Sequence, residues 1–210
     1  MAERTDTRTR LLDASVRLIA REGLQALSHR SVEREAGTTH GSTSYYFRTR
    51  DALLEQVVAY LAERDNQSIS ELTRDPYFRE PRGPSEIATV FAQATERFLD
   101  DSRETTLARF ELCLYAARKP ELQERLTSWR GFLVSHLQRV LHSLDLPHPE
   151  SGARMFAAML DGILFTAICV PEMMSHEEIE KQLNAVLTAC AYAGSEWDGD
   201  VDPLAGNPFG

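Results

Sequence analysis

Apolar residues recur at intervals of three and four along almost the whole chain, which is the spacing that places them on one face of an α-helix. In residues 11–23 arginines occupy the opposite face, and Gly23 stands where a helix end favours a residue of positive φ. No segment alternates strictly between apolar and polar residues, as a half-buried strand would. The pattern therefore predicts an all-α protein.

Three further helices are expected before residue 74, each opened by a residue whose hydroxyl can accept backbone N–H bonds. Ser28 is a suitable N-cap for a short helix that ends before Gly37, Thr39 for a helix over residues 40–47, and Thr49 for one over residues 51–72. Three prolines and a glycine predict a loop over residues 74–85. Beyond it we expect helices over residues 85–101, 103–118, 120–144, 149–170 and 175–193.

Charge is distributed unevenly along the chain. The whole sequence carries 23 Lys and Arg against 32 Asp and Glu, a formal net charge of -9, which argues against contact with nucleic acid. Residues 1–50, however, carry 9 basic and 6 acidic side chains, whereas residues 51–210 carry 14 and 26. A basic module joined to an acidic body is the pattern expected when only one end of a protein contacts a polyanion.

Composition and the chain ends indicate a soluble, cytoplasmic protein. Hydrophobic residues make up 42% of the sequence and charged residues 26%, as in globular proteins. The N-terminus has no apolar stretch of the secretory kind, and the apolar run at residues 163–170 is far shorter than the roughly 18 residues that span a bilayer. We therefore expect no membrane partner.

Residues 28–47 have the length and punctuation of a helix-turn-helix, with a capped short helix, a turn that contains glycine, and a second helix. The second helix begins with small and hydroxylic residues, and Gly41 within it costs about 1 kcal/mol relative to Ala, so we expect it to permit close approach to DNA. Tyr45 and Tyr46 lie about 100° apart on a helix, so one is expected to face outward and the other inward. The alternative is that residues 45–47 only anchor a small helical domain.

These residues carry a resemblance to a known family. Residues 11–58 resemble the N-terminal DNA-binding domain of the TetR family of bacterial transcription regulators. The matching positions are Ala36, Gly37, Thr38, Thr39, Gly41, Ser42, Tyr46, Phe47, Arg48, Arg50, Leu53 and Leu54. The sequence departs from the family pattern at Thr43, where Leu is usual, and at Ser44, where Tyr is usual.

The resemblance implies a three-helix DNA-binding domain over residues 1–50 and a helical domain for effector binding and dimerisation over residues 51–193. Residues 194–210 are rich in Gly, Asp and Pro, and this composition predicts a flexible tail. The resemblance also implies that Arg30 contacts phosphate and that Tyr46 and Arg50 grip the DNA backbone. The residues expected to face the major groove are Thr39, His40, Gly41, Ser42, Ser44 and Tyr45. It implies a homodimeric repressor that a small-molecule effector releases from double-stranded DNA at an inverted-repeat operator.

The body of the chain offers candidate dimer and effector residues. We expect residues 149–170 and 175–193 to form a four-helix bundle with a second copy, through Met159, Ile163, Ile179, Leu183, Val186 and Leu187. The alternative is that both helices complete a monomeric core. The residues expected around an effector pocket are Phe91, Phe98, Phe110, Tyr115, Trp129, Phe132, His136 and Met155, and His136 or Glu111 would orient a polar ligand group. At helical spacing, such residues also form ordinary core.

Catalytic and metal-binding motifs are not found in the sequence, so we expect no enzyme activity and no cofactor. Asp198, Asp200 and Asp202 imitate the start of a calcium-binding loop, but Pro203 and Phe209 stand where glycine and the closing glutamate should be. Two alternatives remain: a TetR-like regulator controlled by a protein partner or by no ligand, and, less favoured by the sequence, a helical enzyme or metal-binding protein.

Overall fold

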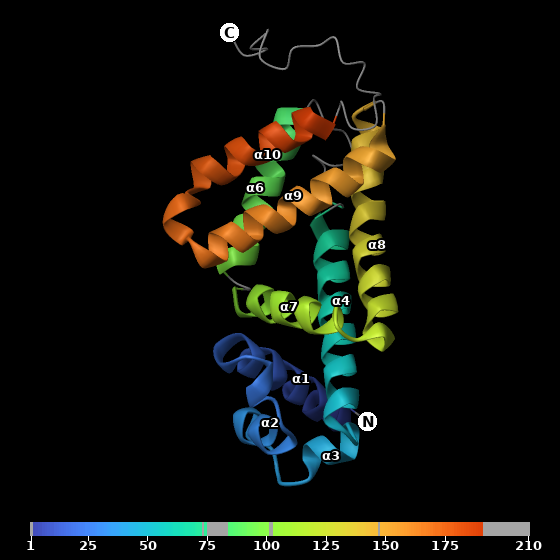
Figure 1. The fold of residues 1–210 in the computed structure, drawn as a ribbon, viewed down its shortest axis with the longest axis vertical. Coiled ribbons are helices and arrows are strands. Elements are labelled where there is room, and N and C mark those ends of the chain that lie inside the picture. The colour runs from blue at the N-terminus through green and yellow to red at the C-terminus, as the bar shows by residue number, and fades with distance from the viewer. Residues whose placement is uncertain (1, 73, 75–83, 101–102, 147, 191–210) are drawn as a thin grey trace.

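The computed structural model describes residues 2–72, 74, 84–100, 103–146 and 148–190, and within them the fold is all-α, as the spacing predicts (Figure 1). The α-helices are α1 (Ala2–Glu22), α2 (His29–Ala36), α3 (Ser42–Tyr46), α4 (Arg50–Leu72), α6 (Pro84–Asp100), α7 (Arg103–Ala116), α8 (Pro120–Ser143), α9 (Pro149–Cys169) and α10 (His176–Cys190). Short 3-10 turns, η1 (Leu24–Ala26) and η2 (Pro171–Met173), follow α1 and α9. The tail at residues 194–210 lies outside the described residues.

Local hydrogen bonds explain where the first helices begin and end. The Ser28 hydroxyl accepts the backbone N–H of Ser31 and opens α2, which ends at Gly37 in the left-handed conformation. Thr49 accepts the N–H of Ala52 at the start of α4. The cap predicted at Thr39 is wrong, because α3 begins at Ser42 and its N-cap is Gly41.

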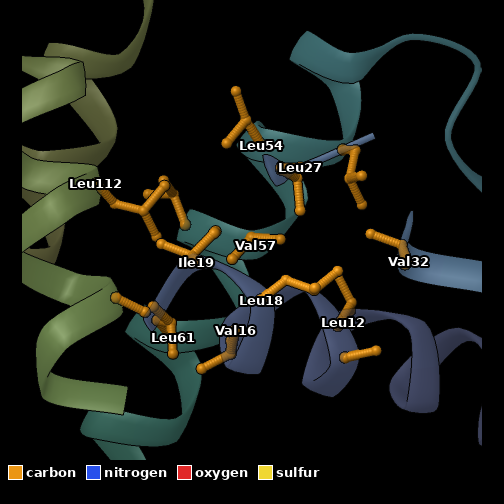
Figure 2. Packing of buried hydrophobic residues seen from close by; sticks show 14 of the residues in the cluster. Leu12, Val16, Leu18, Ile19, Leu27, Val32, Leu54, Val57, Leu61 and Leu112 are labelled. Atoms are coloured by element: carbon orange, nitrogen blue, oxygen red, sulfur yellow. The ribbon is translucent and has the colours of Figure 1, made fainter. Parts of the chain in front are cut away.

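The first hydrophobic cluster joins the N-terminal helices to the body (Figure 2). It contains buried residues of α1, α2 and the first half of α4, and it also takes in Leu112 of α7 and Trp129 of α8. Residues of α4 as far as Leu61 belong to this cluster, so the packing does not mark the domain boundary expected at residue 50. α1, on which α2 is packed, therefore lies directly against α7 of the body.

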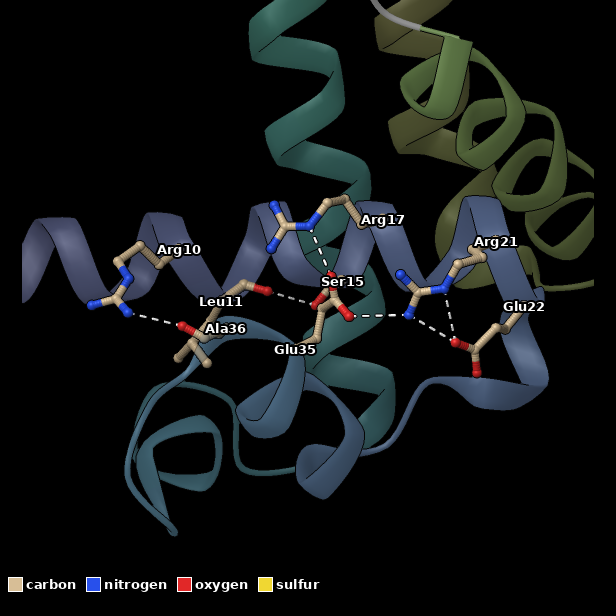
Figure 3. Close-up of polar contacts among 8 residues, drawn as sticks. All are labelled: Arg10, Leu11, Ser15, Arg17, Arg21, Glu22, Glu35 and Ala36. Atoms are coloured by element: carbon tan, nitrogen blue, oxygen red, sulfur yellow. Dashed lines mark hydrogen bonds and ion pairs between the residues drawn. The ribbon is translucent and has the colours of Figure 1, made fainter.

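Ion pairs reinforce the contact between α1 and α2 (Figure 3). Arg17 and Arg21 of α1 both donate to the Glu35 carboxylate of α2, at 2.9 and 3.0 Å. The hydrogen bond from Arg17, together with that from Arg21, lowers the pKa of Glu35. Arg10 donates to the carbonyl of Ala36 at 2.9 Å. These contacts add to the apolar packing of α2 against α1 in the first cluster.

The second hydrophobic cluster joins α6, α8, α9 and α10 at the opposite end of the molecule (Figure 1). Among the described residues, α9 is the one helix long and apolar enough to cross a membrane by length and composition alone. The unbroken apolar run noted in the sequence covers only residues 163–170, whereas the average over α9 is apolar although the helix contains three charged residues. A core helix has the same composition, and Phe156 and Ala157 of α9 are fully buried in the second cluster.

Candidate nucleic-acid interface

α2 and α3 lie at one end of the long axis, with α10 at the other (Figure 1). α3 presents Ser44 and Tyr45 to solvent, and Tyr45 is 63% exposed. Thr39, His40 and Gly41 precede the helix and are also exposed, whereas Ser42 is half-buried. Six residues predicted to face the major groove therefore lie together on one segment, and their contact with DNA stays a prediction.

Gly41 has a different role from the one that the sequence suggested. It is not inside a helix: it is the N-cap of α3, with φ of +88° in the left-handed region. A Cβ atom at this position would meet nothing within 4 Å. Glycine is favoured here because the turn into α3 needs positive φ, and this is sufficient without any close approach to DNA.

The backbone at the start of α3 is held by Glu33, a residue of α2 that sequence reasoning missed. One oxygen of its buried carboxylate accepts the backbone N–H groups of Gly41 and Thr43, both at 3.0 Å. The other oxygen lies 3.3 Å from Nδ1 of His40. Nothing in the sequence distinguishes Glu33 from the other acidic residues of α2, because its partners follow eight and ten residues later.

The two tyrosines divide between the surface and the core, as their spacing predicts. Tyr45 is exposed, whereas Tyr46 is half-buried and packs against the first cluster. Their rings meet edge to face with centroids 5.0 Å apart. The hydroxyl of Ser44 lies 3.1 Å from Nδ1 of His29 on α2. The side chain of Tyr45 is exposed, as a contact with the groove or with phosphate would require.

The arginines near the reading segment differ in the exposure of their side chains and in their hydrogen bonds. Arg30, near the start of α2, and Arg48, just after α3, are exposed. Arg50 instead donates to the carbonyl oxygens of Leu27 and Leu24, at 3.0 and 2.6 Å. Its half-buried side chain joins the start of α4 to the segment after α1. These bonds give Arg50 a structural role, and its contact with phosphate stays a prediction.

The residues expected around an effector pocket are distributed over both clusters. Trp129 and Tyr115 pack in or against the first cluster, and Phe91 and Met155 in or against the second. Phe110 meets Phe165 edge to face at 5.5 Å, and Phe132 lies 4.2 Å from the ring of His136. Glu111 is exposed, and the side chain of Phe98 lies outside the described set. Their role in binding a ligand stays a prediction.

A buried ion pair lies where α4 meets α7 and α8. The Asp65 carboxylate of α4 accepts from Nη2 of Arg109 at 2.8 Å and from the indole N–H of Trp129 at 3.1 Å. The Arg109 guanidinium lies 5.7 Å from the centre of the Trp129 ring. Burial raises the pKa of Asp65, against the opposing effect of Arg109. This network links the helix that follows the DNA-reading segment to two helices of the body.

Five of the six residues predicted at the dimer interface are buried within the chain. Ile163, Ile179, Leu183, Val186 and Leu187 belong to the second cluster, so we correct their assignment to the chain's own core. Met159 alone among the six is exposed. The outward face of α9 instead carries Ala158, Met159, Gly162, Phe165 and Cys169, all exposed.

Among the described residues, no group of three or more His, Cys, Asp or Glu side chains could hold a metal ion, and residues 198–209 lie outside that set.

Comparisons with known proteins match almost the whole of this architecture. The family model described as "Bacterial regulatory proteins, tetR family" matches residues 11–57, and that described as "Tetracyclin repressor-like, C-terminal domain" matches residues 82–189. The chain is 27% identical over 182 residues to the HTH-type transcriptional regulator BetI of Vibrio campbellii, covering 84% of this chain and 88% of that protein.

Solved structures share the fold. A transcriptional regulator from Rhodococcus sp. Rha1 superposes with a TM-score of 0.73 at 24% identity, covering 87% of this chain and 94% of its own. The multidrug binding protein EbrR complexed with ethidium superposes with a TM-score of 0.65 at 26% identity, covering 86% of this chain and 97% of its own. A regulator from Saccharomonospora viridis, solved in complex with choline, has a TM-score of 0.72 at 13% identity and shows likeness of fold alone.

Proposed function

The chain belongs to the TetR family of bacterial regulatory proteins, and from this premise we propose that it is a homodimeric repressor which a small molecule releases from an inverted-repeat operator. The observation that carries the proposal is the segment from Thr39 to Tyr45, which exposes all its residues except Ser42 and Thr43 and whose backbone is held by Glu33 of α2. A short rigid segment with hydroxyl, imidazole and phenol groups has the donors and acceptors that read base edges in the major groove. As a DNA-binding regulator it would act in the cytoplasm.

A second copy of the chain is the proposed occupant of the outward face of α9. Phe165 is 52% exposed there, and the neighbouring Ala158 and Gly162 are small enough to let another helix approach closely. The outward face of α10 adds Ala185 and Thr188, which are also exposed. Two-fold pairing would present two α3 segments to half-sites about 34–36 Å apart or a multiple of this distance.

Effector binding would reach the DNA-reading segment through α4. This helix contributes to the first cluster at one end and carries Asp65, bound to α7 and α8, further along. A ligand that favours a different packing of α7 and α8 would therefore shift α4 and change the spacing of the two reading segments. Coupling of about 1–3 kcal/mol would lower operator affinity roughly five- to 150-fold.

Binding-site selection with the purified full-length chain and a pool of randomised duplexes tests the DNA-binding part of the proposal. We expect an enriched inverted repeat, bound by two copies of the chain in sedimentation or light scattering. If no sequence is enriched over random DNA at moderate salt and without effector, the proposal is contradicted.

Ethidium is the first effector probe to test, because the similar protein EbrR was solved with it. We expect a bound ligand to reduce fluorescence anisotropy of the labelled operator. If a ligand that demonstrably binds the protein leaves the anisotropy unchanged, control by that ligand is excluded. Control by a protein partner would then become the better account.

A further inference from the structure

The DNA-reading segment is fastened to α2 by one buried carboxylate. The Glu33 side chain is only 7% exposed, and its Oε1 accepts the N–H groups of Gly41 and Thr43, each at 3.0 Å. Gly41 is the N-cap of α3 and has no side chain, so the free N–H groups at the start of this helix need an acceptor from elsewhere. Glu33 is that acceptor, and it comes from a different helix.

α3 is too short to hold its conformation without contacts from other segments. It comprises only five residues, and a helix this short is unstable without tertiary contacts. Thr43 is fully buried, but it stands where the family usually has Leu, so it offers fewer apolar atoms to anchor the helix. Charge-assisted hydrogen bonds are about twice as strong as neutral ones. The carboxylate therefore supplies a tether at the position where apolar anchoring is weakened.

The second oxygen of the same carboxylate faces a predicted base-reading residue. Oε2 of Glu33 lies 3.3 Å from Nδ1 of His40, while the His40 side chain is 83% exposed. The contact is electrostatic: a negative charge at this distance favours a proton on the facing Nδ1, and Nε2 lies on the opposite side of the ring. Glu33 thus influences both where His40 lies and which of its nitrogens carries the proton.

We propose that Glu33 is a positioning residue for DNA recognition, which holds the start of α3 through Gly41 and Thr43 and orients His40 toward the operator. This inference rests on the proposed function, because it assumes that α3 reads DNA. Glu33 makes no contact with DNA in the proposal. It acts by keeping the reading segment in the conformation that fits the groove.

The first test compares Glu33→Ala with Glu35→Ala in the full-length protein. Both variants remove one negative charge from α2, but Glu35 contacts α1 and not the reading segment. The probe is the duplex selected by the wild-type chain. If the competent conformation falls to about one molecule in ten, the apparent Kd of Glu33→Ala rises about tenfold. We expect Glu35→Ala to change it less than twofold.

Backbone hydrogen exchange, measured by NMR without DNA, provides an independent readout of the same contact. We expect the amides of Gly41 and Thr43 to lose protection in Glu33→Ala and to keep it in Glu35→Ala. If both variants keep this protection and bind the duplex equally well, the proposal is overturned. If the wild-type chain selects no duplex at all, the proposed function fails, while the exchange measurement still tests whether Glu33 holds α3.

A conservative variant separates the positioning of His40 from the stability of α3. In Glu33→Gln the amide oxygen can still accept the two backbone N–H groups, but the amide NH2 then faces His40 and favours a lone pair on Nδ1. We expect Glu33→Gln to keep most of its affinity and to select a different base at one operator position. In a His40→Ala background, Glu33→Gln should not alter the selected sequence. An unchanged motif in Glu33→Gln would overturn the orienting role.

Discussion

Removal of either partner of the buried Asp65–Arg109 pair should destabilise the protein by several kilocalories per mole. Both side chains are nearly buried, with 10% and 13% exposure, and their ion pair measures 2.8 Å. Arg109→Met removes the cation that donates to the Asp65 carboxylate, and Asp65→Asn removes the anion that accepts from the buried Arg109 guanidinium. In each case the remaining charge stays in a poorly solvated position.

The magnitude follows from the cost of an uncompensated buried charge. Breaking a buried pair by removing one partner costs about 3–5 kcal/mol. For a chain of 150–250 residues each kcal/mol corresponds to roughly 2–4 °C in Tm, so we expect each single variant to lose about 6–20 °C in thermal unfolding followed by circular dichroism. The double variant Asp65→Asn with Arg109→Met leaves no unpaired charge, and it should lose clearly less than the sum of the two.

The two single variants should also differ in their response to pH. Burial already raises the pKa of Asp65, and Arg109→Met removes the guanidinium that opposes this effect. A carboxyl whose pKa is higher in the folded state than in the unfolded state favours folding when protonated. Its stabilisation is complete below the unfolded pKa of about 3.9 and is lost as pH rises through the folded value. The deficit of Arg109→Met should therefore shrink on acidification.

A double-mutant cycle gives the result that would refute this reasoning. If the losses of the two single variants add to that of the double variant within about 0.5 kcal/mol, Asp65 and Arg109 are not energetically coupled. A deficit of Arg109→Met that grows on acidification would contradict the stated sign. Additivity would also contradict the proposal that the Asp65–Arg109 contact couples α4 to α7 of the body.

Three further predictions concern other parts of the molecule. Phe165→Glu should convert the dimer to a monomer, as measured by light scattering, because it places a charge on the proposed apolar interface. An unchanged dimer would contradict the assignment of the interface to this face of α9. Arg50→Met should lower Tm because its bonds to Leu24 and Leu27 are lost, and an unchanged salt dependence of operator binding in this variant would contradict its predicted contact with phosphate. Arg48→Ala should lower the salt slope by about one unit, and an unchanged slope would contradict a phosphate contact there. In chemical unfolding, Gly41→Ala should lower the free energy of unfolding by about 1–2 kcal/mol, and Gly41→Asn should lower it by less, because Asn tolerates positive φ. Equal free energies for the wild type and both variants would contradict the need for positive φ at this position.

Local features of the sequence predicted the helices well. The caps at Ser28 and Gly37 depend on neighbours within a few residues, so their residue types are informative without any knowledge of the fold. Glu33 and Arg50 escaped prediction because their partners lie on other segments, which only the tertiary structure brings near. Likewise, the stripe of Ile179 and Leu183 correctly indicated an apolar face, but periodicity alone does not tell whether that face is covered by the same chain or by a second copy.

The arrangement of charge along the molecule reconciles its acidity with DNA binding. α9 and α10 with their connection, residues 149–190, carry six acidic and two basic residues and lie at the end of the molecule opposite α3 (Figure 1). The 23 residues of α4 alone span about 34 Å at a rise of 1.5 Å per residue. At physiological ionic strength the Debye length is about 8 Å, so the negative charge of the far end is screened before it reaches DNA bound at α3. The salt dependence of operator binding should therefore be governed by the arginines near α3, such as Arg30 and Arg48, and not by the net charge of the chain.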